Sequence, residues 1–77
     1  MIYYLPVREK HCIGSTHTYT AYGIKVLSVT QQHTKILVYI PDISLSRQAV
    51  VSLAECCTQK HLSPIHIFDV IEDFLAE

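Results

Sequence analysis

The chain has 77 residues and a mass of 8.8 kDa, which leaves room for one small domain that we expect to occupy residues 1–77. Hydrophobic residues make up 49% of it and charged residues 17%, which excludes a disordered tail. The net charge is −1, which excludes a uniformly basic surface of the kind that binds nucleic acid.

The first part of the chain predicts a strand and a turn. Residues 2–7 are rich in aromatic and β-branched side chains and indicate an edge strand, since Pro6 cannot donate a hydrogen bond to a neighbour. Residues 8–11 are charged and form either a turn or a solvated strand end. Residues 12–18 are small and polar, and Gly14 among them predicts a turn.

Two further strands follow. Residues 19–30 alternate with a period of two and predict the most regular strand of the chain. Gly23 within it indicates a bulge or the close approach of a large neighbour. Residues 31–33 predict a hairpin loop without glycine, and residues 35–41 predict a returning strand that ends at Pro41.

The second half of the chain predicts two helices. Asp42 or Ser44 can cap the first helix, which should end near residues 59–60. Its apolar stripe consists of Leu45, Ala49, Val50, Leu53, Ala54 and Cys57. Ser63 is the expected N-cap of the second helix, and Pro64 occupies the first position, where a missing N–H costs nothing. The second stripe consists of Ile67, Val70, Ile71, Phe74 and Leu75.

Strands followed by helices indicate an α+β fold, with a three-stranded antiparallel β-meander followed by two α-helices packed on one face of the sheet. The uncovered face of such a sheet is polar in a soluble monomer, but neither face is polar here. In one register the outward residues are Leu27, Val29, Leu37 and Tyr39. In the other they are Tyr22, Ile24 and Val26. Either register leaves an apolar patch, which predicts an interface unless the stems of Lys25 and Lys35, the Tyr hydroxyls and the N-terminal segment cover it.

Histidine and cysteine are frequent, with five and three residues, but their spacing does not favour a metal centre. Cys57 and His61 are one helical turn apart, and His11, Cys12 and His17 are further candidate ligands. A structural zinc site needs four ligands with close pairs such as C-x2-C, which this sequence lacks. We therefore expect no metal and no cofactor. The odd cysteine count predicts free thiols in a reducing cytoplasm.

Catalysis is not expected either. His11 and Cys12 are neighbours in a strand, where adjacent side chains face opposite ways, so they do not form a nucleophile–base pair. His66, Asp69 and Asp73 share one side of the second helix and can act as a His–carboxylate pair, as a docking surface for a basic partner, or simply as a solvated face.

Three short segments resemble landmarks of a known family. The run SPIHIFDVIEDF at residues 63–74 resembles the ending of a small bacterial family that is catalogued only as a domain of unknown function. The segments YGI at residues 22–24 and DIS at residues 42–44 are similar to its earlier landmarks, so the resemblance covers about residues 19–75. It implies a short, stand-alone cytoplasmic protein and brings no activity, cofactor or catalytic residue.

These patterns predict a non-enzymatic protein that acts by protein–protein contact, as a homodimer through the sheet or as a regulatory adaptor. The expected contact residues are Leu27, Val29, Leu37, Tyr39, His66, Asp69 and Asp73. The alternative is a nucleic-acid accessory protein that uses Arg8, Lys10 and Lys25 beside the aromatic residues Tyr3 and Tyr4. No run of 18 apolar residues occurs and the N-terminal segment has no basic leader, so we expect neither a membrane partner nor secretion.

Overall fold

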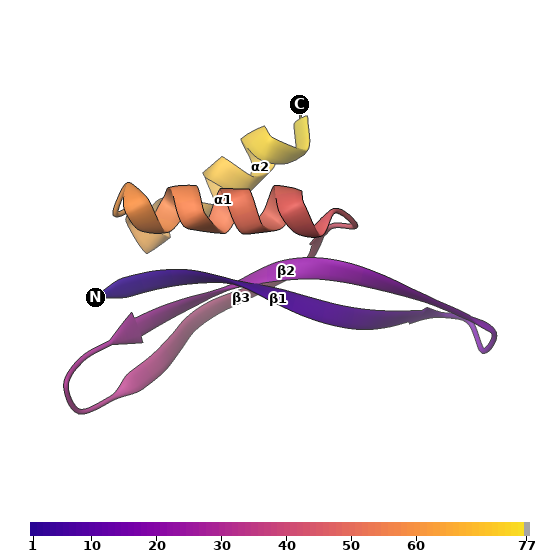
Figure 1. The fold of residues 1–77 in the computed structure, drawn as a ribbon, viewed down its shortest axis with the longest axis horizontal. Coiled ribbons are helices and arrows are strands. Elements are labelled where there is room, and N and C mark those ends of the chain that lie inside the picture. The colour runs from indigo at the N-terminus through magenta and orange to yellow at the C-terminus, as the bar shows by residue number, and fades with distance from the viewer. Residues whose placement is uncertain (77) are drawn as a thin grey trace.

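Three antiparallel strands precede two helices in the structure, a computed structural model that describes residues 1–76 (Figure 1). The strands are β1 (Ile2–Ile13), β2 (His17–Val29) and β3 (Thr34–Ser44). The helices are α1 (Arg47–Gln59) and α2 (Ile67–Ala76), and α2 is preceded by the 3₁₀ turn η1 (Pro64–His66). The strand order is β1-β2-β3, and both helices lie on one side of the sheet, which confirms the α+β prediction.

The core lies between the sheet and the helices. Its buried members are Tyr4, Ile24, Val26 and Ile43 from the sheet, Val50, Ala54 and Cys57 from α1, and Ile67 and Ile71 from α2. Because side chains alternate along a strand, Tyr4 and Val26, which pair across β1 and β2, define the helix side of the sheet. Burying each large apolar side chain stabilises the fold by about 1.5–3 kcal/mol.

The first hairpin is longer than the sequence pattern predicts. The charged segment 8–11 is part of β1 and pairs with residues 19–22 of β2, so it is neither a turn nor a strand end. The chain reverses at Gly14, as predicted, with φ +67°. The hairpin projects as a two-stranded arm beyond the helices (Figure 1). Pairing across β1 and β2 satisfies the backbone here, so charged side chains do not end the strand.

Strand β3 does not end at Pro41, contrary to the prediction. It continues to Ser44 past a shift in register, with Asp42 in the left-handed region at φ +55°. Gly23 makes this bulge possible, because a Cβ at Gly23 would lie 2.9 Å from the Cα of Pro41 and closer still to the carbonyl oxygen of Ile40. The close approach predicted at Gly23 is confirmed, and the proline lies within the irregular segment that this approach creates.

The N-cap of α1 is Ser46, and neither predicted cap is correct. The Ser46 hydroxyl accepts a hydrogen bond from the Ala49 amide at 3.3 Å. Ser44 instead accepts from the Ser46 amide at 3.1 Å. Asp42 accepts from the Tyr19 hydroxyl at 2.8 Å. Both residues lie in β3, because the strand extends three residues past its predicted end.

The second helix begins later than predicted. Ser63 makes no side-chain capping hydrogen bond, and the residues after it form the turn η1. Helix α2 therefore starts at Ile67, which is buried together with Ile71. Leu75 lies at the edge of the predicted apolar stripe and is 59% exposed. The core therefore covers only part of the stripe.

Candidate functional site

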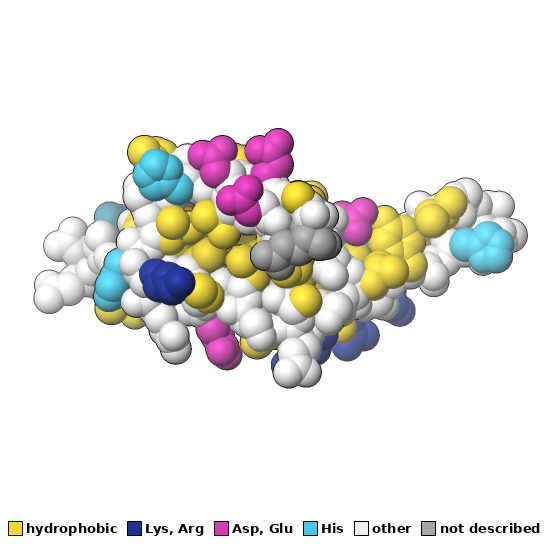
Figure 2. Space-filling view, turned by 90° about the horizontal axis from the view of Figure 1, so that it is seen from above, with side chains coloured by type: hydrophobic (Ala, Val, Ile, Leu, Met, Phe, Trp, Pro, Cys, Tyr) yellow, Lys and Arg dark blue, Asp and Glu magenta, His cyan; other side chains and the backbone are white. Residues whose placement is uncertain are grey.

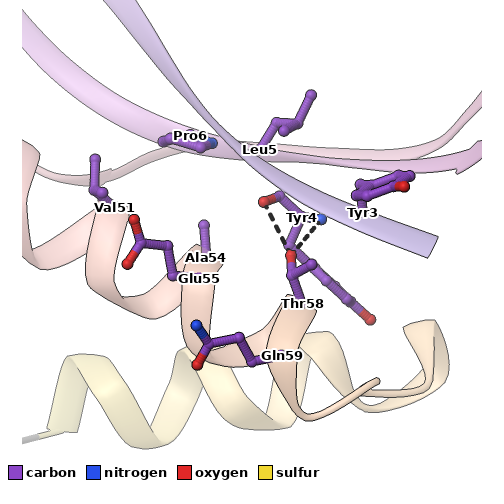
Figure 3. Close-up of a pocket in the computed structure, with 9 residues that line it drawn as sticks. All are labelled: Tyr3, Tyr4, Leu5, Pro6, Val51, Ala54, Glu55, Thr58 and Gln59. Carbon is purple, nitrogen blue, oxygen red and sulfur yellow. Dashed lines mark hydrogen bonds between the residues drawn. The ribbon is translucent and has the colours of Figure 1, made fainter.

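The outer face of the sheet, opposite the helices, carries an apolar patch. Its members are Tyr3, Leu5 and Val7 on β1, Lys25, Leu27 and Val29 on β2, and Ile36, Leu37 and Tyr39 on β3. Leu5, Lys25 and Tyr39 oppose one another in register, one residue away from the buried row of Tyr4 and Val26. Figure 3 shows Leu5 directed away from α1, while Tyr4 is directed toward the helices. We call these nine residues the outer patch.

The four predicted sheet contact residues all belong to the outer patch. Leu37 and Tyr39 are each 41% exposed, and Leu27 and Val29 are half-buried. Leu37 has no partner because it lies at a register shift between Val26 and Leu27 of the neighbouring strand. The same shift places Ile36 opposite Leu27, with 55% of its surface exposed.

The two lysines that the sequence offers to cover the apolar patch lie on different faces of the sheet. The ammonium group of Lys25 lies 5.6 Å from the centre of the Tyr39 ring, which favours a cation–π contact. Because Tyr39 is on the edge strand β3, this contact draws the charge toward the border of the patch. Lys35 pairs with Ser28, which alternates with Leu27, so its side chain belongs to the helix side of the sheet.

A polar cluster occupies the arm end of the outer face. The Glu9 carboxylate accepts from the Asp42 amide at 3.0 Å and lies 3.3 Å from Nε2 of His11. The His11 and Tyr19 rings stack at 5.1 Å. The Tyr19 hydroxyl donates to Asp42, and this bond raises the pKa of Tyr19 because it stabilises the protonated phenol beside an anion. These contacts hold the irregular part of β3 against β1 and β2.

A shallow groove of about 500 Å³ separates the free edge of β1 from α1 (Figure 3). Its lining residues are Tyr3, Tyr4, Leu5, Pro6, Val51, Ala54, Glu55, Thr58 and Gln59. The Thr58 hydroxyl accepts from the Tyr4 amide at 3.0 Å and donates to the Tyr4 carbonyl at 3.4 Å. Pro6 has no N–H to offer, so this stretch of the edge is closed to a further strand.

The predicted acidic surface is present on α2. Asp69 and Asp73 are exposed, as is His66, which ends η1 and therefore precedes the helix instead of lying in its first turn. Acidic side chains gather on this part of the helix-side surface (Figure 2). No ion pair involving them occurs within residues 1–76.

The predicted basic trio is divided between the two faces of the sheet. Arg8 and Lys10 alternate in step with the buried Tyr4 and so belong to the helix side, whereas Lys25 is in the outer patch. Arg8 instead shares a hollow with Arg47 of α1, a residue that sequence reasoning missed. Because only the fold brings the start of α1 next to β1, no local motif in the sequence indicates that Arg8 and Arg47 lie together.

The three cysteines are free thiols that differ in burial. Cys12 and Cys56 are exposed, and Cys57 is buried in the core. Burial raises the pKa of the Cys57 thiol, the neighbouring Cys56 raises it further, and Lys60 partly opposes the shift. Cys57 is therefore held as a neutral thiol, the form that is not nucleophilic. Across the described part of the chain, no three His, Cys, Asp or Glu side chains converge on a point where a metal ion could bind.

Comparison with known proteins identifies a family but no function. The model of a family of unknown function, DUF6514, matches residues 1–77. Comparisons with curated proteins and with solved structures found no match. Neither helix in residues 1–76 has the length and apolar content needed to cross a membrane.

Proposed function

The chain belongs to DUF6514, a family of unknown function, and from its surface we propose that it is a non-enzymatic protein–protein contact module that pairs with a second copy of itself through the outer patch. The observation that carries this proposal is the exposure of large apolar side chains on the sheet face that no helix covers. Leu5, Leu37 and Tyr39 are 41–44% exposed. Soluble monomers rarely leave a contiguous patch of this kind in water.

A second copy suits the outer patch better than an unlike charged partner does. The patch has no carboxylate, and its one cation, Lys25, is drawn over Tyr39 at the border. Two such faces can meet without burying an unpaired charge at their centre. Open sheets commonly pack face to face about 10 Å apart with interdigitating side chains, and a two-fold dimer uses the same patch on both subunits.

The size of the patch sets the expected strength of pairing. Three strands about 4.8 Å apart and about eight residues long span roughly 400 Å² of sheet. That projected area is about half of the ~800 Å² that each partner buries in a standard interface. We therefore expect a dimer that dissociates on dilution, with a dissociation constant in the micromolar range.

Sedimentation velocity on the purified chain, from low micromolar to millimolar concentration, tests the proposal. We expect the sedimentation coefficient to rise with concentration in the wild type and to stay that of a monomer in the variant Leu37→Asp/Tyr39→Asp. The matched control is Ile65→Asp, because Ile65 is 79% exposed but lies in η1, away from the sheet. A wild type that remains monomeric throughout, or a double variant that still dimerises, would show the proposal to be wrong.

A further inference from the structure

A small hollow on the helix side of the sheet is lined by two arginines. It has a volume of about 140 Å³ and is bordered by Pro6, Arg8, Tyr22, Arg47 and Val51. Arg8 comes from β1, Tyr22 from β2 and Arg47 from the first turn of α1, so three separate elements meet there. The hollow lies on the face opposite the outer patch and is independent of the proposed dimer contact.

The two guanidinium groups lack an anionic partner within residues 1–76. The ion pair found there joins His11 and Glu9, on the other face of the sheet. Helix α1 has no acidic residue in its first turn, so no carboxylate there offsets the charge of Arg47, which lies next to the positive end of the helix dipole. Two like charges that share one hollow repel each other, and an anion bound between them removes that repulsion.

A third basic residue lies near the hollow, and the nearest acidic residue on α1, Glu55, lies about two turns beyond Arg47 in the adjoining groove. Lys10 lies two residues beyond Arg8 on the same face of β1, so its ammonium group adds to the positive potential. In the helix-side view, basic side chains gather along part of the lower border near the base of the projecting arm, and acidic side chains gather at the upper border, with a further acidic side chain on the lower border (Figure 2).

We propose that the hollow between Arg8, Arg47 and Tyr22 is a binding site for the phosphate group of a small molecule. A carboxylate has two oxygens, which one arginine satisfies in a bidentate contact. Two arginines and a tyrosine, each from a different element, line the hollow, and their N–H and O–H groups are donors of the kind that suits a tetrahedral group with three or more free oxygens. The volume is below the ~300 Å³ of an ordinary ligand pocket, so the hollow holds the phosphate and leaves the rest of the molecule in solvent.

A nucleic acid fits this face less well. A polyanion needs a row of phosphate contacts, and the acidic surface of α2 repels any strand that extends from the hollow across the helices. Lys25, the third basic residue of the predicted nucleic-acid surface, lies on the other face of the sheet.

Titration of the ¹⁵N-labelled full chain with inorganic phosphate, followed by NMR, tests the proposal. Sodium chloride of equal ionic strength serves as the reference. We expect saturable shifts centred on the amides of Arg8, Tyr22 and Arg47. Each of the variants Arg8→Gln and Arg47→Gln should weaken binding about tenfold or more, since each removes a charge-assisted contact. Lys35→Gln is the control, because it removes one positive charge far from the hollow and should leave the affinity unchanged.

The other outcomes decide against the proposal. Shifts that do not saturate, or that are equal in the wild type and in both arginine variants, show that the hollow is no phosphate site. Acetate that competes as well as phosphate shows a carboxylate site. A single-stranded oligouridine that binds at least tenfold more tightly than phosphate identifies a nucleic acid as the ligand. The amide spectrum of each variant also reports whether it is folded, so a loss of binding through unfolding is recognised directly.

Discussion

The hydroxyl of Thr58 serves both backbone groups of Tyr4, accepting from its N–H at 3.0 Å and donating to its carbonyl at 3.4 Å. One side chain on α1 thereby takes the place of a neighbouring strand at the free edge of β1. The Tyr4 ring extends further inward, where its hydroxyl donates to the Leu62 carbonyl at 2.6 Å. Tyr4 thus fastens the sheet to the last turn of α1 and to the segment that follows it.

Replacing Thr58 by valine should destabilise the fold. The Thr58→Val change preserves shape but leaves the half-covered N–H and carbonyl of Tyr4 without a partner, which costs about 1–3 kcal/mol of the free energy of unfolding. Urea denaturation measures that loss. Thr58→Ser, which keeps the hydroxyl, should lose less than about 1 kcal/mol, the value of one buried methyl group. Equal losses in the two variants would mean that the hydroxyl contributes little.

The two glycines should respond differently to the same substitution. At Gly23 a side chain would collide with backbone atoms of Ile40 and Pro41, so Gly23→Asn should lose about 1–3 kcal/mol or fail to fold. At Gly14 a Cβ meets open space and φ is +67°, a conformation that asparagine tolerates. Gly14→Asn should therefore stay within about 0.5 kcal/mol of the wild type in thermal or urea unfolding. Similar losses at both positions would contradict the steric argument.

Pattern and turn chemistry predicted the elements, and long-range contacts determined where they end. The period-two alternation of β2 and the helical stripes are local signals, and they indicated the α+β fold correctly. Proline is a local stop signal, yet β3 passes Pro41 because Gly23, eighteen residues earlier in the chain, leaves room for a bulge. The N-cap moved from Asp42 and Ser44 to Ser46 for the same reason.

Local sequence pattern likewise predicted one of the two candidate sites, the outer patch, but not the other. Leu37 and Tyr39 could be assigned to the outer patch because alternation and the shortage of helices are visible in the sequence. The Arg8–Arg47 pair could not be predicted from the sequence, because only the folded core brings β1 and α1 together. Lys25 lies on the opposite face of the sheet from Arg8 and Lys10. This could not be predicted, because the face of each residue depends on which residues of β1 and β2 pair with each other.

Removal of the Glu9 side chain should loosen the irregular part of β3. Only 9% of its side chain is exposed, and its carboxylate accepts a hydrogen bond from the Asp42 amide and lies beside His11. Glu9→Ala should lower the free energy of unfolding by about 1–2 kcal/mol, because a charged acceptor of a backbone N–H is lost. Glu55→Ala removes the same charge at an exposed position on α1 and should change stability by no more than about 0.5 kcal/mol. A Glu9 variant as stable as the Glu55 variant would count against this role.

Buried groups that resist ionisation should make the fold sensitive to alkali. Burial raises the pKa of the Cys57 thiol above its ordinary value of 9.0, and burial together with Cys57 raises the pKa of Tyr4 above 10.0. At pH 7 both groups are neutral in the folded and the unfolded chain, so they do not affect stability. Above it the unfolded chain loses protons first, and the free energy of unfolding falls as pH rises toward the folded-state pKa values.

Urea denaturation at a series of pH values from 7 to 11 measures this fall, and a cysteine variant separates the two contributions. In Cys57→Ala the cavity lowers stability at every pH, but the decline with pH should begin only near 10, where Tyr4 starts to ionise in the unfolded chain. In Cys56→Ala, which removes an exposed thiol, the decline should still begin near 9. If the free energy of unfolding of both variants begins to fall at the same pH as that of the wild type, the buried thiol is not the cause. Titration of other groups in the unfolded chain then has to account for the loss of stability.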